Sequence, residues 1–159
     1  MSIKKEIPNI LTLGNLLAGC LGLYFVMQSK LEYAAYMIFI SLVCDFLDGF
    51  LARLLHAYSD IGKELDSLAD VVSFGILPSF ILLNLVEQSC GNQCTIGLFG
   101  FYKPFLVFSL ALMSAYRLAK FNVDTRQTDQ FIGVPTPANG LLVASLPLIL
   151  QFQPEYTPY

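Results

Sequence analysis

The sequence contains few charged side chains, one histidine and four cysteines. Charged residues make up 13% of the 159 positions, whereas hydrophobic residues make up 55%. This composition excludes an intrinsically disordered chain and is unusual for a soluble domain of this length. The sequence also lacks a linker, an internal repeat, a low-complexity tract and any sign of a second domain. We therefore interpret residues 1–159 as a single domain of a polytopic membrane protein.

Long apolar runs predict the membrane spans, because about 20 mainly apolar residues cross the hydrocarbon core of a bilayer. The spans are expected near residues 7–29, 33–55, 62–85, 96–119 and 131–153. The first run is too long for the core of a signal peptide and has no obvious cleavage site, so we interpret it as a retained helix. In the third span, Gly75 and Pro78 suggest a bend. The predicted fold class is an all-α, polytopic transmembrane helical bundle with five visible spans.

Four carboxylates interrupt the apolar pattern between Asp45 and Asp70. The fixed positions of this stretch read DxxDGxxARx8GxxxDxxxD, which corresponds to Asp45, Asp48, Gly49, Ala52, Arg53, Gly62, Asp66 and Asp70. At about 100° per residue, the first two acids share one face of a helix and the last two share one face of another. A hairpin of these helices brings the four carboxylates together. Like charges at such range force some of them to protonate unless a cation lies among them.

A divalent metal is the natural cation for such a group. Oxygen ligands, without a histidine or cysteine at ligand spacing, favour Mg²⁺ or Mn²⁺ over zinc, and Mg²⁺ in turn suggests phosphate chemistry. Two other classes of function stay open at this point. A membrane metal-ion transporter also carries intramembrane acids, but it needs ligands near the bilayer midplane and a path through the protein. A purely structural module has no need of Gly49 and Gly62 beside the acids.

The pattern resembles, without a gap or substitution, the signature of the CDP-alcohol phosphotransferase family, whose members are integral membrane enzymes of phospholipid synthesis. The resemblance implies transfer of the phosphatidyl group of CDP-diacylglycerol to an alcohol, with release of CMP. It also implies two Mg²⁺ or Mn²⁺ ions held by Asp45, Asp48, Asp66 and Asp70. Asp70 is in addition expected to be the catalytic base. The family core has six helices, so a chain with five spans is expected to be truncated at its C-terminus.

Seven residues are expected to bind CDP-diacylglycerol by the same resemblance. Asn9 and Thr12 belong to the PNILT segment at the start of the first span, and Ser59 matches a position where the family commonly has a hydroxyl. The signature contributes the other four, Gly49, Ala52, Arg53 and Gly62. Glycine lets the nucleotide pass close to the backbone, and an arginine guanidinium can donate two parallel hydrogen bonds to phosphate oxygens. His56, the only histidine, is assigned no role.

The acceptor is inferred from two segments beyond the signature. RLAKFN at 117–122 and FIGVPTPANG at 131–140 resemble the phosphatidylserine synthase branch of the family, although Lys120 stands where an arginine is more usual. This resemblance implies L-serine as the acceptor, bound by Arg117, Lys120 and Asn122. A phosphorylated acceptor such as glycerol 3-phosphate could use the same cations. Phosphatidylglycerophosphate synthesis and the family's other acceptors therefore stay open.

The distribution of lysine and arginine predicts the orientation in the membrane. Lys4, Lys5, Arg53, Lys63, Lys120 and Arg126 fall on the side that holds the N-terminus and the signature, against Lys30 and Lys103 on the other. By the positive-inside rule, the N-terminus and the active site face the cytoplasm of a bacterial-type inner or plasma membrane. Cys90 and Cys94 then lie outside, where they could form a disulfide. We expect membrane lipids and a second copy of the chain as partners, and no nucleic acid.

Overall fold

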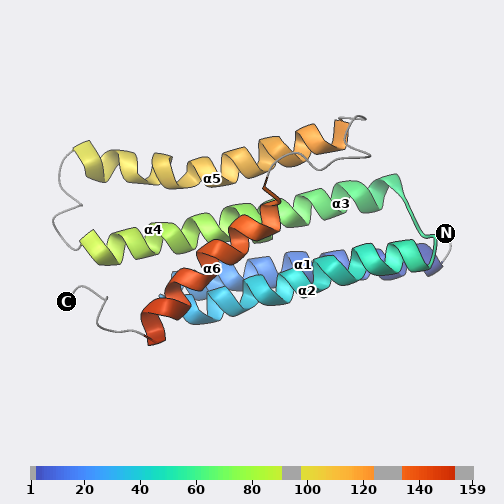
Figure 1. Ribbon diagram of the computed structural model, residues 1–159, viewed down its shortest axis with the longest axis horizontal. Helices are drawn as coiled ribbons and strands as arrows, with labels where there is room; N and C mark the ends of the chain where they lie inside the picture. The colour runs from blue at the N-terminus through green and yellow to red at the C-terminus, as the bar shows by residue number, and fades with distance from the viewer. Residues whose placement is uncertain (1–2, 91–97, 124–133, 153–159) are drawn as a thin grey trace.

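The computed structural model describes residues 3–90, 98–123 and 134–152, and these residues form helices joined by short turns (Figure 1). In chain order the elements are α1 (Ile3–Met27), α2 (Leu31–Leu54), α3 (Asp60–Asp70), the π-helix η1 (Val71–Ile76), α4 (Leu77–Cys90), α5 (Leu98–Val123) and α6 (Thr136–Phe152). α3, η1 and α4 follow one another without a break and form one long rod. The prediction of an all-α, polytopic membrane bundle is confirmed.

The described residues include four helical segments that are long and apolar enough to cross a membrane: Glu6–Met27, Leu31–Leu54, Asp60–Ser89 and Pro104–Val123. They correspond to the first four predicted spans. The fifth predicted span corresponds to α6, an apolar helix of 17 residues. At 1.5 Å per residue, α6 rises about 25 Å, which is shorter than the hydrocarbon core of about 30 Å.

The α1–α2 and α2–α3 turns reverse the chain with the same backbone hydrogen-bond pattern. Ser29 and His56 each follow a helix end and adopt a positive φ, of 58° and 50°. The amide of Ala57 donates to the carbonyl of Ala52 at 2.9 Å, and the amide of Lys30 makes the equivalent 3.0 Å bond to Phe25. These are Schellman motifs, which satisfy the last carbonyls of a helix. As a result, α2 is antiparallel to both α1 and α3, and the start of α1 lies at the same end as the α2–α3 turn (Figure 1).

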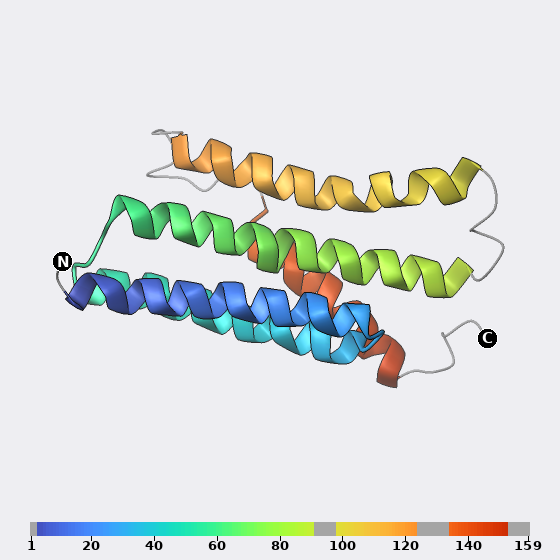
Figure 2. The same cartoon turned by 180° about the vertical axis from the view of Figure 1, so that it is seen from behind.

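A compact apolar core joins the helices in the half of the bundle away from that turn. It consists mainly of Ala34, Ala35, Ile38, Phe74, Leu77, Ile81, Val143 and Ala144. α6 crosses α4 and α2 obliquely over this core (Figures 1 and 2). Gly140 permits a close approach of α6 to η1, since a Cβ there would lie 3.0 Å from the ring of Phe74.

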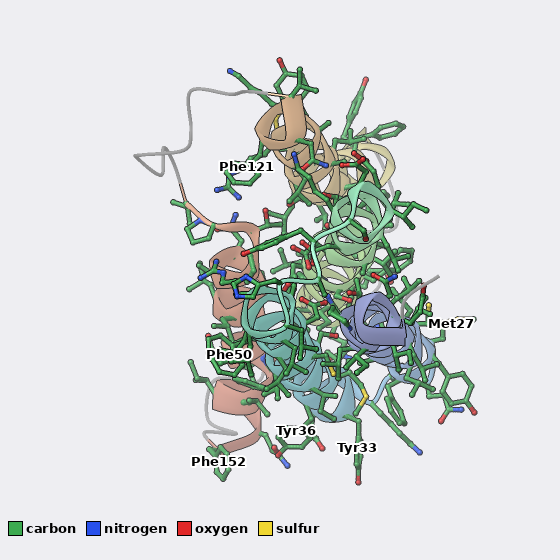
Figure 3. All side chains as sticks on the ribbon, turned by 90° about the vertical axis from the view of Figure 1, so that its right-hand side faces the viewer. Met27, Tyr33, Tyr36, Phe50, Phe121 and Phe152 are labelled. Carbon is green, nitrogen blue, oxygen red and sulfur yellow. The ribbon has the colours of Figure 1, made fainter. Side chains whose placement is uncertain are left out.

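The outer surface of the bundle is also apolar. Met27, Tyr33 and Phe50 are 84%, 50% and 51% exposed and point away from the helices (Figure 3). Large exposed side chains of this kind would be an aggregation hazard in water but suit contact with lipid. The chain is therefore an integral membrane protein.

The segment where a bend was expected is a π-helix, η1. Gly75, in its last turn, faces α5, and a Cβ there would lie 3.2 Å from Cβ of Ser114. Pro78 follows as the second residue of α4, inside the continuous rod, where it cannot donate a backbone hydrogen bond. π-Helical turns are rare and occur frequently at functional sites. η1 begins directly after Asp70, the last acid of the signature.

Candidate active site

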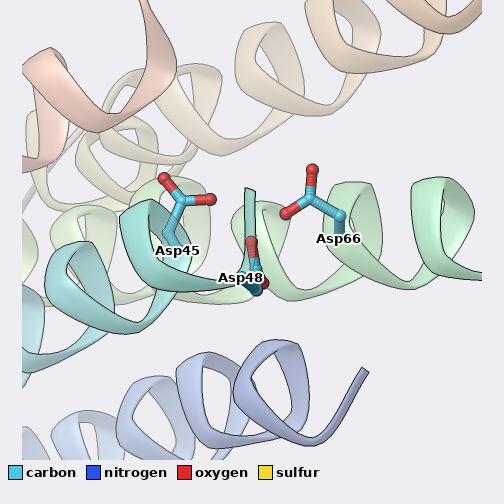
Figure 4. A group of neighbouring side chains, drawn as sticks. All are labelled: Asp45, Asp48 and Asp66. Carbon is cyan, nitrogen blue, oxygen red and sulfur yellow. The ribbon is translucent and has the colours of Figure 1, made fainter. Parts of the chain in front are cut away.

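Three carboxylates converge from two helices near one end of the bundle. Asp45 and Asp48 are three positions apart on α2, and Asp66 comes from the facing part of α3 (Figure 4). One oxygen of each carboxylate lies within 4.8 Å of the others. The hairpin predicted from the signature spacing therefore brings these three acids together.

The three carboxylates fit a metal ion by two criteria. Asp48 is only 5% exposed, and Oδ1 of Asp66 is buried without a hydrogen-bond partner among the described residues. A buried charged oxygen left unpaired in this way is costly, and a cation would satisfy it. The group consists of oxygen ligands alone, which is typical of sites for hard divalent ions. This acidic cluster could therefore hold a metal ion.

Asp70 lies outside this group of three. It is 7% exposed, and its Oδ1 accepts a hydrogen bond from Nδ2 of Asn15 on α1 at 3.1 Å. The structure therefore gives Asp70 a protein partner that sequence reasoning missed. The available signal was the position of Asn15 itself, because an amide inside an apolar membrane helix suggests a functional contact.

Thr12, also on α1, contacts another of the acids. Its Oγ1 lies 2.6 Å from Oδ2 of Asp48 and donates to it, and the threonine is 3% exposed. Thr12 was expected among the nucleotide-binding residues, and the structure adds a direct contact with a carboxylate. α1 thus touches one acid on α2 and one on α3.

A cavity of about 220 Å³ opens beside the carboxylates. Its lining includes Asp48 and Asp66 together with all seven residues expected to bind CDP-diacylglycerol, namely Asn9, Thr12, Gly49, Ala52, Arg53, Ser59 and Gly62. Sequence reasoning missed the lining residues Ala57, Tyr58 and Lys63. Lys63 follows Gly62 directly, so its place beside the signature was the signal that could have identified it.

The two glycines of the cavity differ in their surroundings. A Cβ built on Gly49 would meet nothing within 4 Å, so this position borders open space. A Cβ on Gly62 would lie 2.9 Å from Oγ of Ser59 and 3.0 Å from Oδ1 of Asn9. Ser59 is the N-cap of α3, and its hydroxyl accepts a hydrogen bond from the Gly62 amide at 3.0 Å. Gly62 therefore lets α1 approach the capped start of α3.

The end of α5 is tied to α3 and to α6. Nδ2 of Asn122 donates to Oγ of Ser67 at 2.8 Å, and Nζ of Lys63 donates to the carbonyl of Asn122 at 3.0 Å. Nη1 of Arg117 donates to Oγ1 of Thr136, the first residue of α6, at 2.8 Å. The three residues expected to bind the acceptor thus occupy this end of α5, where Lys120 is exposed.

Some predicted features lie outside the described residues. They are the polar loop 124–133, which holds the start of the FIGVPTPANG segment, and Cys94, the expected partner of Cys90.

Comparison with known proteins gives a family and several relatives. A family model described as CDP-alcohol phosphatidyltransferase matches residues 5–157. The CDP-diacylglycerol–serine O-phosphatidyltransferase of Bacillus subtilis is 34% identical over 143 residues, which is 88% of this chain and 74% of the relative. The proteins of the same name from Helicobacter pylori and Methanocaldococcus jannaschii are 37% and 35% identical, over 86% and 89% of this chain. The chain spans 54% and 61% of the length of these two relatives. No solved structure matches the chain.

Proposed function

We propose, since the chain belongs to the CDP-alcohol phosphatidyltransferase family, that it transfers the phosphatidyl group of CDP-diacylglycerol to L-serine and releases CMP. The observation that carries this proposal is the cavity, in which three helices bring the expected nucleotide-binding residues against Asp48 and Asp66. The relatives from Bacillus and Helicobacter are named for this reaction.

Metal ions are part of the proposal. Asp45, Asp48 and Asp66, with Asp70 beside them, would hold two Mg²⁺ or Mn²⁺ ions. Such ions, when bound, neutralise the pyrophosphate and stabilise the entering and leaving oxygens of an in-line displacement. The unpaired Oδ1 of Asp66 supports this assignment.

Two cations of the cavity would bind the phosphates of the donor. Arg53 and Lys63 both line the cavity and are solvent-exposed. The guanidinium of Arg53 can donate to two phosphate oxygens at once, and Lys63 adds a point charge on the opposite helix. Gly49 borders open space, so the donor can approach the backbone of α2 there.

Asp70 would accept the proton of the serine hydroxyl. The hydrogen bond from Asn15 uses Oδ1 of Asp70, which leaves Oδ2 for the proton. Such a carboxylate is a weak base, but phosphoryl transfer demands little activation of the nucleophile in most analyses. The positive charges of Arg117 and Lys120 would bind the serine carboxylate. Asn122, which bonds to Ser67, would hold this end of α5 beside α3.

The cytoplasmic orientation and the homodimer are also proposals. Arg53, Lys63 and Lys120 belong to the end of the bundle where α1 begins, whereas Lys30 belongs to the other end. The positive-inside rule supports a cytoplasmic site, where a CDP-activated lipid head group and free serine are available. The homodimer rests on the family resemblance alone.

The acceptor can be tested by measuring CMP release from CDP-diacylglycerol with L-serine, glycerol 3-phosphate or inositol phosphate offered separately. We expect serine to react fastest by a wide margin. Arg117→Ala should raise the KM for serine by about 10- to 100-fold, because a hydrogen bond to a charged group contributes roughly 1.5 to 3 kcal/mol. Faster turnover with glycerol 3-phosphate would contradict serine as the acceptor and leave the metal site unaffected.

The metal site can be tested with the same assay. Activity should vanish in chelator and return with Mg²⁺ or Mn²⁺, and Asp45→Asn, Asp48→Asn and Asp66→Asn should each abolish it. Asp60→Asn is the matched control, because Asp60 is an exposed acid at the start of α3 and does not line the cavity. Full activity in a stringently metal-free preparation would rule out the proposed site. Metal uptake into vesicles without CMP release would indicate a transporter.

A further inference from the structure

Asn15 on α1 is not part of the signature, but its side-chain amide contacts one of the signature acids. Asn15 is fully buried, at 0% exposed, and its Nδ2 donates to Oδ1 of Asp70 at 3.1 Å. An ionised carboxylate can only accept hydrogen bonds, so it is the NH₂ group of the amide that faces it. The contact therefore fixes one oxygen of Asp70 and the rotation of its carboxylate.

The amide is not explained by packing. Oδ1 of Asn15 is buried and has no hydrogen-bond partner among the described residues. An unpaired buried oxygen is unfavourable, and a leucine of similar size would avoid it in an apolar helix. The backbone at this position is already held, because Ser41 and Ser73 donate to the Asn15 carbonyl at 3.2 Å and 3.1 Å. Among the described residues, the polar contact of the side chain is with Asp70 alone.

We propose that Asn15 is a positioning residue that orients Asp70 toward the acceptor hydroxyl, an inference that rests on the proposed base role of Asp70. With Oδ1 held, Oδ2 receives the hydroxyl proton while the serine oxygen bonds to phosphorus and CMP leaves. Thr12, one turn earlier on α1, makes the corresponding contact with Asp48 at 2.6 Å. α1 thereby sets a carboxylate on each of two other helices.

The test is a double-variant cycle measured in purified protein. Asn15→Leu should lower kcat about 10- to 100-fold, as expected for loss of a hydrogen bond to a charged group, while the KM for CDP-diacylglycerol changes less than about threefold. In the Asp70→Asn background, Asn15→Leu should cause no further loss, because no base is left to orient. With radiolabelled substrate and micromolar enzyme, a rate 10⁴-fold below a typical kcat of about 1 to 10³ s⁻¹ stays measurable.

Two further variants keep the result decisive. Ser41→Ala removes a hydrogen bond to the backbone of Asn15 and should leave kcat within about twofold of the parent protein. Asn15→Ala adds no bulk and replaces Asn15→Leu if that variant does not fold. With Asp70→Asn reduced to a low but measurable rate, a further loss on adding Asn15→Leu would overturn the positioning role. An increase in KM for both substrates would overturn it as well. Full activity of Asp70→Asn would instead remove the base from the proposed function, and the role of Asn15 with it.

Discussion

Thr12 makes the shortest of the side-chain hydrogen bonds to the acids, at 2.6 Å from Asp48. Thr12→Val keeps the shape of the side chain and removes the donor, so a buried carboxylate oxygen loses its partner. We expect activity to fall about 10- to 100-fold. Thr12→Ser retains the hydroxyl and should keep most of the activity. Both variants are compared by CMP release and by thermal unfolding in detergent, and equal activities of the two would show that the hydroxyl does not matter.

At the scale of residues, the signature positions could be predicted and their supporting contacts could not. The spacing of Asp45, Asp48 and Asp66 follows from helical periodicity, and the structure brings their oxygens within 4.8 Å. The contacts of Thr12 and Asn15 join positions 36 and 55 residues apart. Such contacts depend on how α1 packs against α2 and α3, which no local pattern encodes. The same holds for Asn122, whose bond to Ser67 also spans 55 residues.

Alanine substitutions at two glycines on different helices should distinguish an effect on substrate binding from an effect on stability. Gly49→Ala places a methyl group where nothing lies within 4 Å, at the wall of the cavity. Because alanine is favoured over glycine by about 1 kcal/mol in a helix, the fold should be unchanged or slightly more stable. The KM for CDP-diacylglycerol should rise, since the methyl group occupies space proposed for the donor. An unchanged KM would argue against that placement of the donor.

Gly19 is the matched position in the packed part of α1. A Cβ there would lie 2.5 Å from Oγ and 3.2 Å from Cα of Ser73, so a backbone shift is required. Gly19→Ala should therefore lower the stability by about 1 to 3 kcal/mol, the range for overpacked cores. The measurement is thermal unfolding of both glycine variants in detergent. A Gly19→Ala protein as stable as Gly49→Ala would show that α1 and η1 are not closely packed.

At the scale of elements, the helices could be predicted from apolar runs, since few charges interrupt them and a bilayer requires a fixed length. α2 spans Leu31–Leu54 where residues 33–55 were expected. Gly75 and Pro78 predicted a bend, but the π-helical form could not be predicted, because no local pattern in VVSFGI distinguishes it from other bends. Residues 62–85 were predicted as one span. The structure divides this span at η1 into α3, which carries Asp66 and Asp70, and α4, which contributes to the apolar core.

Among the described residues, the acids, the cavity and the cations Arg53, Lys63 and Lys120 belong to one end of the bundle. The start of α1, the α2–α3 turn and the end of α5 meet there, and the apolar core occupies the other half (Figure 1). Under the proposed function, the cavity would open to one aqueous side and the acids would be within reach of a lipid substrate. A site at one end also disfavours the transporter alternative, which needs ligands near the bilayer midplane.

The orientation can be tested by cysteine labelling in a variant whose four native cysteines are replaced and whose activity is retained. Gln28→Cys and Asp60→Cys introduce exposed thiols at opposite ends of α2, in the α1–α2 turn and at the start of α3. A membrane-impermeant maleimide should label Gln28→Cys in intact cells and Asp60→Cys only after permeabilisation. The reason is that Arg53, Lys63 and Lys120 lie at the same end of the bundle as Asp60, which the positive-inside rule places in the cytoplasm. The reverse pattern would overturn the orientation but not the fold. Labelling of both thiols from the same side would contradict α2 as a membrane span.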